Sequence, residues 1–273
     1  MIVQLNARTP YGGLLNLPLQ DASSGYVVGA IEGLAPGRAI LSTSTFSSID
    51  GVAFHSARRD QRDIRIRIEF ESNPRFDDVE NLRNNLYRYF QLKQEVELEF
   101  VRSTGTSPRI RGRVESVESV FFAQNPAVDI QVVCFDPYFY DATPTVLNLN
   151  TTGSTATTEV DYAGSAPTGV KLTITPPRTI SDLTLSVTSN YGRTISLVFN
   201  AGINANETLT ITTHPGNKTA SRRVGGTVSS ILYGVSPSSF WPQLEPGINL
   251  VRAAVSGTAI PYTLEYTTRY GGL

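Results

Sequence analysis

Histidine is the first residue type to consider for catalysis, and the chain has only two, His55 and His214. A serine–histidine–aspartate triad would need one of them as its general base. His55 follows a turn and a short strand with no nucleophile-elbow pattern nearby, and His214 lies in the turn-forming run 213–217. We therefore expect both histidines to be surface or turn residues, and we predict no catalytic site.

The sequence offers no pattern for a metal or cofactor either. Acidic ligands at zinc-site spacing are missing around the histidines, and the single cysteine, Cys134, excludes an internal disulfide and a thiolate cluster. Cys134 lies in the apolar run 130–135, which predicts a free, buried thiol. A glycosidase needs only two carboxylates, but the candidate acids alternate with apolar residues beside arginines, which is typical of paired or solvated strand faces.

Three segments, 63–71, 95–100 and 109–114, alternate apolar and charged residues and so predict strands with one charged face. The last two flank the turn-rich run 103–108 and predict a hairpin. If its turn is centred near Gly105, Glu99 faces Arg111 and Glu97 faces Arg113. We favour a solvated salt-bridge face, with a subunit contact or a channel wall as the alternative. The residues concerned are Arg65, Arg67, Glu95, Glu97, Glu99, Arg109, Arg111 and Arg113.

The aromatic residues leave one binding hypothesis open. Trp241, with Phe240 and Tyr233, could form a platform on which a sugar ring stacks. The alternative, which we favour, is that Trp241 packs in the core or fills a subunit contact.

Composition describes an ordinary globular protein. The chain has 273 residues, of which 40% are apolar and 17% charged, with a net charge of -1. A near-neutral chain argues against sequence-independent DNA binding, which needs a basic surface. The N-terminal residues show no secretion signal, and no apolar run approaches the roughly 20 residues of a membrane helix.

The first half, residues 1–141, predicts an α+β domain that is mostly β. Its one helix has Asp77 as the predicted cap, with Glu80 at capping-box spacing. The apolar residues of this helix fall on one face; they are Val79, Leu82, Leu86, Tyr89 and Phe90.

The second half, residues 142–273, shows no helical period. Short apolar–polar runs at 170–175, 183–187, 194–199, 208–212, 249–253 and 262–266 alternate with turn-forming residues. This spacing predicts an antiparallel β-sandwich or jelly roll. Residues 148–155 are mostly polar and predict a linker or an exposed loop. The whole chain is therefore expected to be mainly β.

Several segments resemble the phage distal tail protein family. Their order and spacing carry the resemblance, and no single motif is highly specific. In the first half they are Ile49-Asp50-Gly51, residues 62–66, residues 110–115, Phe121-Phe122 and residues 129–140, which include Asp136-Pro137-Tyr138. In the second half they are residues 162–168, 240–249 and 265–270.

The resemblance implies a structural protein rather than an enzyme. It implies a ring, six-fold in the family, built by the N-terminal domains, with a galectin-like or carbohydrate-module-like sandwich projecting outward. The implied partners are other copies of the chain, the tail tube protein and the tail-tip hub protein, with DNA only as passing cargo and no membrane. The implied location is the virion tail tip, assembled in the host cytoplasm. A glycan-binding receptor module and a wall-degrading enzyme remain the alternatives.

Overall fold

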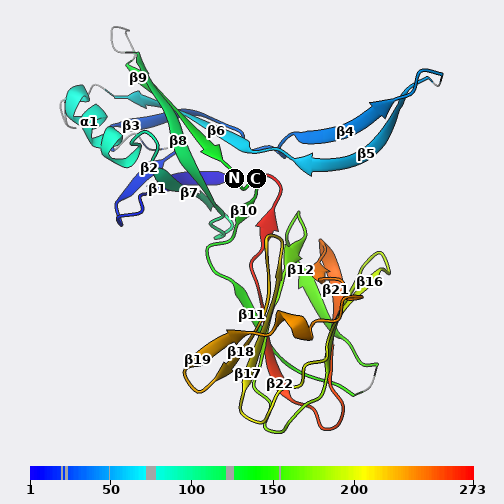
Figure 1. The fold of residues 1–273 in the computed structure, drawn as a ribbon. Helices are drawn as coiled ribbons and strands as arrows, with labels where there is room; N and C mark the ends of the chain where they lie inside the picture. The colour runs from blue at the N-terminus through cyan, green and yellow to red at the C-terminus, as the bar shows by residue number, and fades with distance from the viewer. Residues whose placement is uncertain (20, 22–23, 49, 72–77, 121–125, 154) are drawn as a thin grey trace. The chain divides into compact units, whose positions relative to one another are not determined.

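The computed structural model describes residues 1–19, 21, 24–48, 50–71, 78–120, 126–153 and 155–273 (Figure 1). Ile49, Asp77, Phe121 and Phe122, which belong to the predicted motifs, lie outside the described residues. The chain forms two compact units. Unit 1 comprises Met1–Ala142 together with Gly271–Leu273, and unit 2 comprises Thr143–Tyr270.

Unit 1 is built on one antiparallel sheet, whose main strands run in the order β2-β1-β7-β8-β9-β6-β3. The two-residue strand β10 pairs with β8. These strands are β1 (Ile2–Arg8), β2 (Leu14–Pro18), β3 (Tyr26–Glu32), β6 (Arg62–Phe70), β7 (Glu95–Arg102), β8 (Arg109–Val120), β9 (Ala127–Cys134) and β10 (Phe139–Tyr140).

One face of this sheet is apolar and packs against helix α1 (Val79–Tyr89). Ile64, Ile66 and Ile68 of β6 are almost fully buried, as the strict alternation of that strand predicts. The helix buries Leu82 and Leu86, and the Tyr26 hydroxyl donates a hydrogen bond of 2.8 Å to the carbonyl of Leu82. The cap is Asp78, one residue later than predicted.

Strands β4 (Ala39–Thr45) and β5 (Val52–Arg59) form a separate two-stranded sheet and pair with no other strand of the described residues. They form a long hairpin that projects from the unit 1 sheet (Figure 1), which we call the arm. Leu41 and Phe54 on the arm are 60% and 62% exposed. An isolated two-stranded ribbon with exposed apolar side chains gains little from burial within its own chain.

A buried arginine holds the base of the arm. Arg62 is only 3% exposed. Its guanidinium donates hydrogen bonds to the carbonyls of Gly33, Ala35, Pro137 and Gly271. Its guanidinium also lies 4.7 Å from the centre of the Phe139 ring. Burial lowers the Arg62 pKa from its ordinary value. The contact with Gly271 explains why the last residues of the chain belong to unit 1.

Unit 2 contains a six-stranded sheet, β11-β22-β14-β17-β18-β19, and a four-stranded sheet, β12-β21-β15-β16. The strands are β11 (Thr145–Asn150), β12 (Thr158–Tyr162), β14 (Lys171–Ile174), β15 (Leu183–Ser189), β16 (Thr194–Phe199), β17 (Thr208–His214), β18 (Asn217–Val224), β19 (Thr227–Ser230), β21 (Gly247–Ala254) and β22 (Pro261–Tyr266). Shorter elements are β13 (Thr168–Gly169), β20 (Gln243–Leu244), β23 (Arg269–Tyr270) and the 3-10 turn η1 (Leu232–Gly234).

Both sheets contribute to one apolar core, so unit 2 is an antiparallel sandwich. Leu172 and Leu264 enter the core from the larger sheet, and Leu185 and Val251 from the smaller one. The predicted linker at residues 148–155 is wrong in its first part, because β11 extends through Asn150 and pairs with β22. Its half-buried Leu147 and Leu149 pack against the core, a period-two signal that the polar neighbours obscured. Across the described chain, no helix has the length and apolarity to span a bilayer.

Candidate functional site

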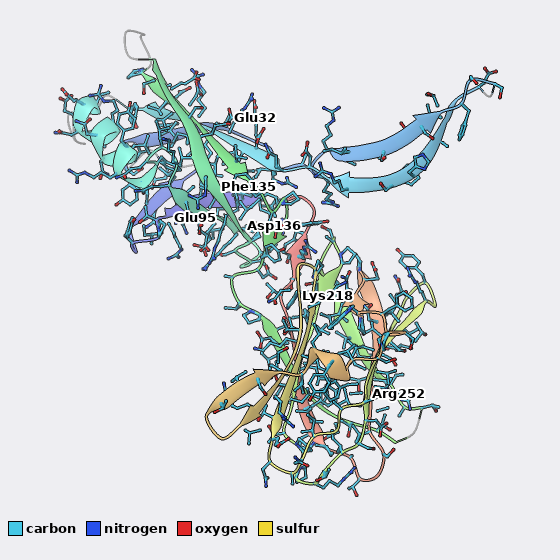
Figure 2. All side chains as sticks on the ribbon, viewed as in Figure 1. Glu32, Glu95, Phe135, Asp136, Lys218 and Arg252 are labelled. Carbon is cyan, nitrogen blue, oxygen red and sulfur yellow. The ribbon has the colours of Figure 1, made fainter. Side chains whose placement is uncertain are left out.

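The charged residues predicted on alternating strands lie on the face of the unit 1 sheet opposite helix α1. The Ser119 hydroxyl of β8 lies 2.5 Å from the Tyr87 hydroxyl of the helix, so its neighbour Glu118 points to the other side. This charged face extends from β1 across the sheet to β3, and Figure 2 labels Glu95 on β7 and Glu32 on β3. It comprises Asn6, Arg8, Glu32, Arg65, Arg67, Glu95, Glu97, Glu99, Arg109, Arg111, Arg113, Glu118 and Asp129.

The β7–β8 hairpin has a different register from the predicted one. Glu99 faces Arg109, Glu97 faces Arg111 and Glu95 faces Arg113. The reason lies in the turn, where the amide of Gly105 donates to the carbonyl of Arg102 and the amide of Arg102 to the carbonyl of Thr106. Gly105 has φ +85°, so the loop is a three-residue one in which glycine takes the left-handed position. That loop is centred on Thr104, which shifts every cross-strand pair by two residues.

Glu99 forms the most enclosed part of the charged face and is only 5% exposed. One carboxylate oxygen accepts from the Asn6 amide at 3.0 Å and from Arg8 at 3.0 Å, and the other accepts from Arg109 at 2.9 Å. Burial raises the Glu99 pKa, but these hydrogen bonds outweigh it and hold the pKa below its usual value. Glu99 therefore links β7 to both neighbouring strands, β1 and β8, through charged hydrogen bonds.

Glu97 continues the network toward solvent. Its carboxylate lies 2.8 Å from Arg111 and 3.3 Å from Arg109, and the Glu97 contacts raise the Arg111 pKa. Arg113 instead donates to the carbonyl of Lys93 at 2.9 Å, although it faces Glu95 across the strands. Arg109 and Arg111 of β8 are therefore neutralised by acids of β7, whereas Arg113 is not.

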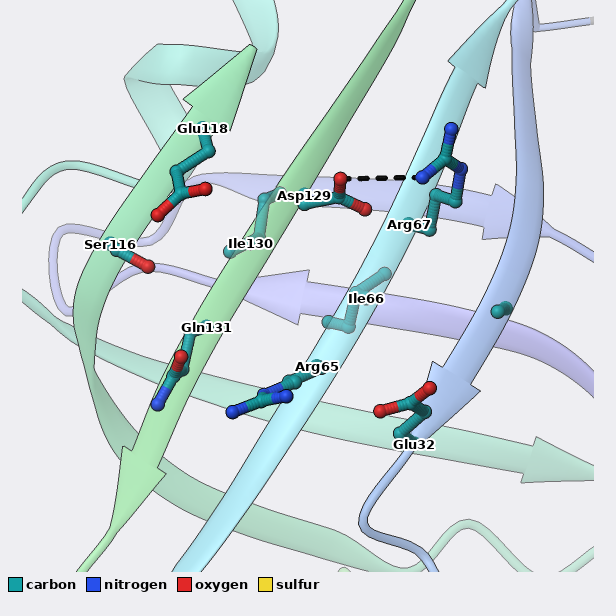
Figure 3. A pocket seen from close by; sticks show the side chains of 10 residues that line it. Glu32, Arg65, Ile66, Arg67, Ser116, Glu118, Asp129, Ile130 and Gln131 are labelled. Atoms are coloured by element: carbon teal, nitrogen blue, oxygen red, sulfur yellow. Dashed lines mark hydrogen bonds and ion pairs between the residues drawn. The ribbon is translucent and has the colours of Figure 1, made fainter. Parts of the chain in front are cut away.

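At its other end the charged face is hollowed. A depression of about 430 Å³ lies over β3, β6, β8 and β9 (Figure 3). Arg67 pairs with Asp129 at 3.4 Å on its wall. Arg65 stands between Glu32 and Gln131 in register, and within the described chain no carboxylate lies within 4.0 Å of its guanidinium. This end of the face is therefore open and only partly neutralised.

The three aromatic residues of the sugar-platform hypothesis do not behave alike. Trp241 is half-buried and packs against the sandwich core, with the Lys218 amine 5.9 Å from its ring centre. Phe240 and Tyr233 are 70% and 78% exposed. Trp241 therefore packs against the core, whereas the rings of Phe240 and Tyr233 are exposed.

The catalytic residue types are dispersed. His55 is exposed on β5, 2.7 Å from the Ser44 hydroxyl. His214 is the last residue of β17 rather than part of the turn, and burial lowers its pKa. Cys134 is a free, buried thiol, as predicted, with a pKa raised by burial to about 12. Among the described residues, no group of three or more potential ligands could hold a metal ion.

Sequence reasoning missed the arm. Leu41, Phe54 and Val52 share one of its faces, since Thr43 pairs with Phe54 and Thr45 with Val52. The available signal was Asp50-Gly51, a strong hairpin dipeptide between two β-prone runs. Arg62 was missed as well, because nothing in an alternating strand marks which of its charged residues is buried.

The Dit (gp 19.1) protein of phage SPP1, described as a paradigm of the hub adsorption apparatus in phages that infect Gram-positive bacteria, has the same architecture. The match covers 97% of this chain and 98% of that one, with a TM-score of 0.66 and 16% sequence identity. This chain has the distal tail protein fold. The chain was expected to be mainly β, with an α+β first half that contains one helix and an antiparallel sandwich as the second half. This fold class is confirmed.

Two structures of the phage P2 baseplate in its activated conformation, one with calcium and one with strontium, are less similar to this chain than the SPP1 protein is. They cover 100% and 99% of this chain at 11% identity, with TM-scores of 0.49 and 0.48, values too low to add to the conclusion. No protein-family model and no curated protein sequence matches the chain.

Proposed function

We propose that this chain is a structural subunit of a phage tail tip, with no enzymatic activity. Copies of it form a homo-oligomeric ring, six-fold as the family resemblance implies, through unit 1. The ring joins the tail tube protein to the tail-tip hub protein and leaves a channel through which DNA passes. Assembly takes place in the host cytoplasm, and the finished ring belongs to the virion.

The arm is the observation that carries this proposal. It projects from unit 1, and its Leu41, Val52 and Phe54 side chains are all about 60% exposed on one face. Contiguous exposed apolar groups on a projecting element mark a protein contact. An arm that reaches a different surface on the next copy makes a head-to-tail contact, and such contacts close into rings.

The charged face supports the channel part of the proposal. DNA must pass without adhering, and each unpaired arginine on a channel wall would bind phosphate. Glu97 and Glu99 neutralise Arg109 and Arg111 within the β7–β8 hairpin, and Asp129 pairs with Arg67. The paired part of this face can line a channel or meet the next subunit without retaining DNA, whereas Arg65 and Arg113 have no acidic partner within the described chain.

The test is the double variant Val52→Ser/Phe54→Ser. We expect it to fold normally but to fail to assemble when the chain is mixed with the tube and hub proteins. The matched control is Val224→Ser/Val228→Ser, which alters two valines that are 49% and 56% exposed on the β18–β19 hairpin of unit 2.

Mass measurement of the assembled particles separates the outcomes. Loss of the oligomer in the arm variant, with the oligomer retained in the control, supports the proposal. Equal assembly of wild type and arm variant would remove the arm from the ring contact, and a wild-type chain that stays monomeric with both partners would contradict the ring itself.

A further inference from the structure

A polar groove with aromatic ends lies along strand β16, at the edge of the smaller sheet of the sandwich. It consists of two adjoining hollows of about 190 Å³ and 360 Å³ that share Arg193 and Ile195. The first continues over Tyr191, Gln243 and Glu245, and the second reaches Phe240. We call this surface the β16 groove.

Two exposed aromatic rings mark the groove. Tyr191 and Phe240 are 80% and 70% exposed, so neither ring is part of the core. Their backbones are nonetheless fixed. The Phe240 amide donates to the Ser196 carbonyl at 3.0 Å, and the amide of Gly192, next to Tyr191, donates to the Ser189 carbonyl at 2.9 Å. An ordered backbone reduces the entropy that is lost when these rings contact a ligand, because only the side chains remain to be ordered.

The first hollow also contains an acid and a base that do not pair with each other. Within the described chain, neither the Arg193 guanidinium nor the Glu245 carboxylate takes part in an ion pair of 4.0 Å or less. The Glu245 backbone is held by the fully buried Asn249, which accepts from its amide at 3.0 Å and donates to its carbonyl at 2.7 Å. The Glu245 carboxylate, the Arg193 guanidinium and the Gln243 amide supply both acceptors and donors for vicinal hydroxyl groups.

We propose that the β16 groove binds a neutral oligosaccharide. The apolar face of a pyranose ring packs on an aromatic side chain, while its hydroxyls need nearby donors and acceptors. Opposite charges on Arg193 and Glu245 disfavour a polyanion such as nucleic acid. An added peptide strand is disfavoured because segment 236–240 already bonds to the β16 edge at Ser196 and Val198. The inference goes beyond ring assembly and does not depend on it.

The experiment uses the full chain and a panel of glucose, galactose and N-acetylglucosamine oligosaccharides in α and β linkages. Saturation-transfer NMR identifies a bound sugar, and calorimetry gives its affinity. We expect at least one sugar to bind, and Tyr191→Ala and Phe240→Ala each to weaken binding about fivefold to tenfold. Tyr233→Ala is the matched control, because Tyr233 is equally exposed at 78% but lines neither hollow.

Three outcomes would overturn the proposal. They are no signal from any sugar at millimolar concentration, unchanged binding in both groove variants, or binding lost only in Tyr233→Ala. Glu245→Gln adds a second readout, since it leaves the apolar contacts intact and should weaken binding through lost hydrogen bonds alone. Assembly of all these variants with tube and hub proteins is expected to match wild type, so failure here is distinguishable from failure of the ring proposal.

Discussion

Two β-hairpins of unit 1 are built in opposite ways. The β7–β8 hairpin lies inside the sheet, with apolar residues such as Leu98 and Ile110 buried on one face and arginines paired with acids on the other. The arm, β4–β5, pairs with no further strand of the described chain and leaves Leu41 and Phe54 exposed. The first satisfies its side chains within its own chain, whereas the second leaves apolar surface for another molecule.

The difference separates stability from assembly. Changes in the β7–β8 hairpin and at the anchor of the arm should alter the free energy of unfolding. Changes at the tip and faces of the arm should leave the monomer unaffected and alter association. Each variant below tests one side of this division.

The largest effect is expected at the anchor of the arm. Arg62→Met removes the donor for four carbonyl groups in a nearly buried site and should destabilise unit 1 by about 3–5 kcal/mol. Chemical denaturation measures this. Arg58→Met, an exposed arginine on β5, should change stability by less than about 0.5 kcal/mol. Similar losses in both variants would mean that Arg62 does not anchor the arm.

The Arg62 anchor also bears on the prediction that residues 1–141 and 142–273 are two domains, which we expect to fold separately. A fragment of residues 1–142 lacks the Gly271 carbonyl that Arg62 contacts and the Leu273 amide that donates to Leu34. We expect it to fold, with a thermal midpoint below that of unit 1 in the full chain. Identical midpoints would show that the C-terminal residues contribute nothing.

Glu99→Gln should cost about 1–3 kcal/mol, because the buried Asn6 amide and two arginines lose a charged acceptor. The folded pKa of Glu99 lies below its ordinary value of 4.5, so its stabilisation is present above that pH and is lost as pH falls through the folded pKa. The difference in the free energy of unfolding between wild type and Glu99→Gln should therefore decrease below about pH 4.5. Chemical denaturation at a series of pH values from neutral to acid measures it. A constant gap across that range would show that the Glu99 charge does not stabilise the hairpin.

Glu97→Gln should have a smaller effect of about 0.5–1 kcal/mol, because Arg111 is largely exposed, its side chain having 72% relative accessibility. Glu95→Gln is the control, with no carboxylate–arginine pair within 4.0 Å in the described chain, and should change stability by less than about 0.5 kcal/mol. High salt should reduce the loss of stability caused by Glu97→Gln, because it screens exposed ion pairs. The triple change of Glu95, Glu97 and Glu99 to Gln should also weaken ring assembly or slow DNA passage if the charged face contacts a subunit or lines the channel.

The sequence was informative wherever burial follows a regular period. Ile64, Ile66 and Ile68 predicted β6, and Leu82 and Leu86 predicted the helix, because one side of each element faces the core. The arm lacks this signal, since its apolar residues are exposed, and only Asp50-Gly51 marks it.

Contacts between distant segments could not be predicted. Glu99 meets Asn6 across 93 positions of sequence, and Arg62 meets Gly271 across 209, so their pairing depends on the fold and not on any local pattern. The register of the β7–β8 hairpin was wrong by two residues because the left-handed Gly105 places the turn centre at Thr104. The β16 groove combines the turn at Tyr191 with residues near 240 and 245, which sequence spacing does not bring together.

The central claim is that this chain forms a ring at the tail tip, and imaging of assembled tail tips tests it most directly. Electron microscopy of particles carrying a tagged copy of the chain gives both its location and its copy number. The account predicts several tagged copies, six by the family resemblance, arranged as a closed ring between tube and hub, with each arm on a neighbouring copy. A single copy per tail, or none at the tip, would contradict it.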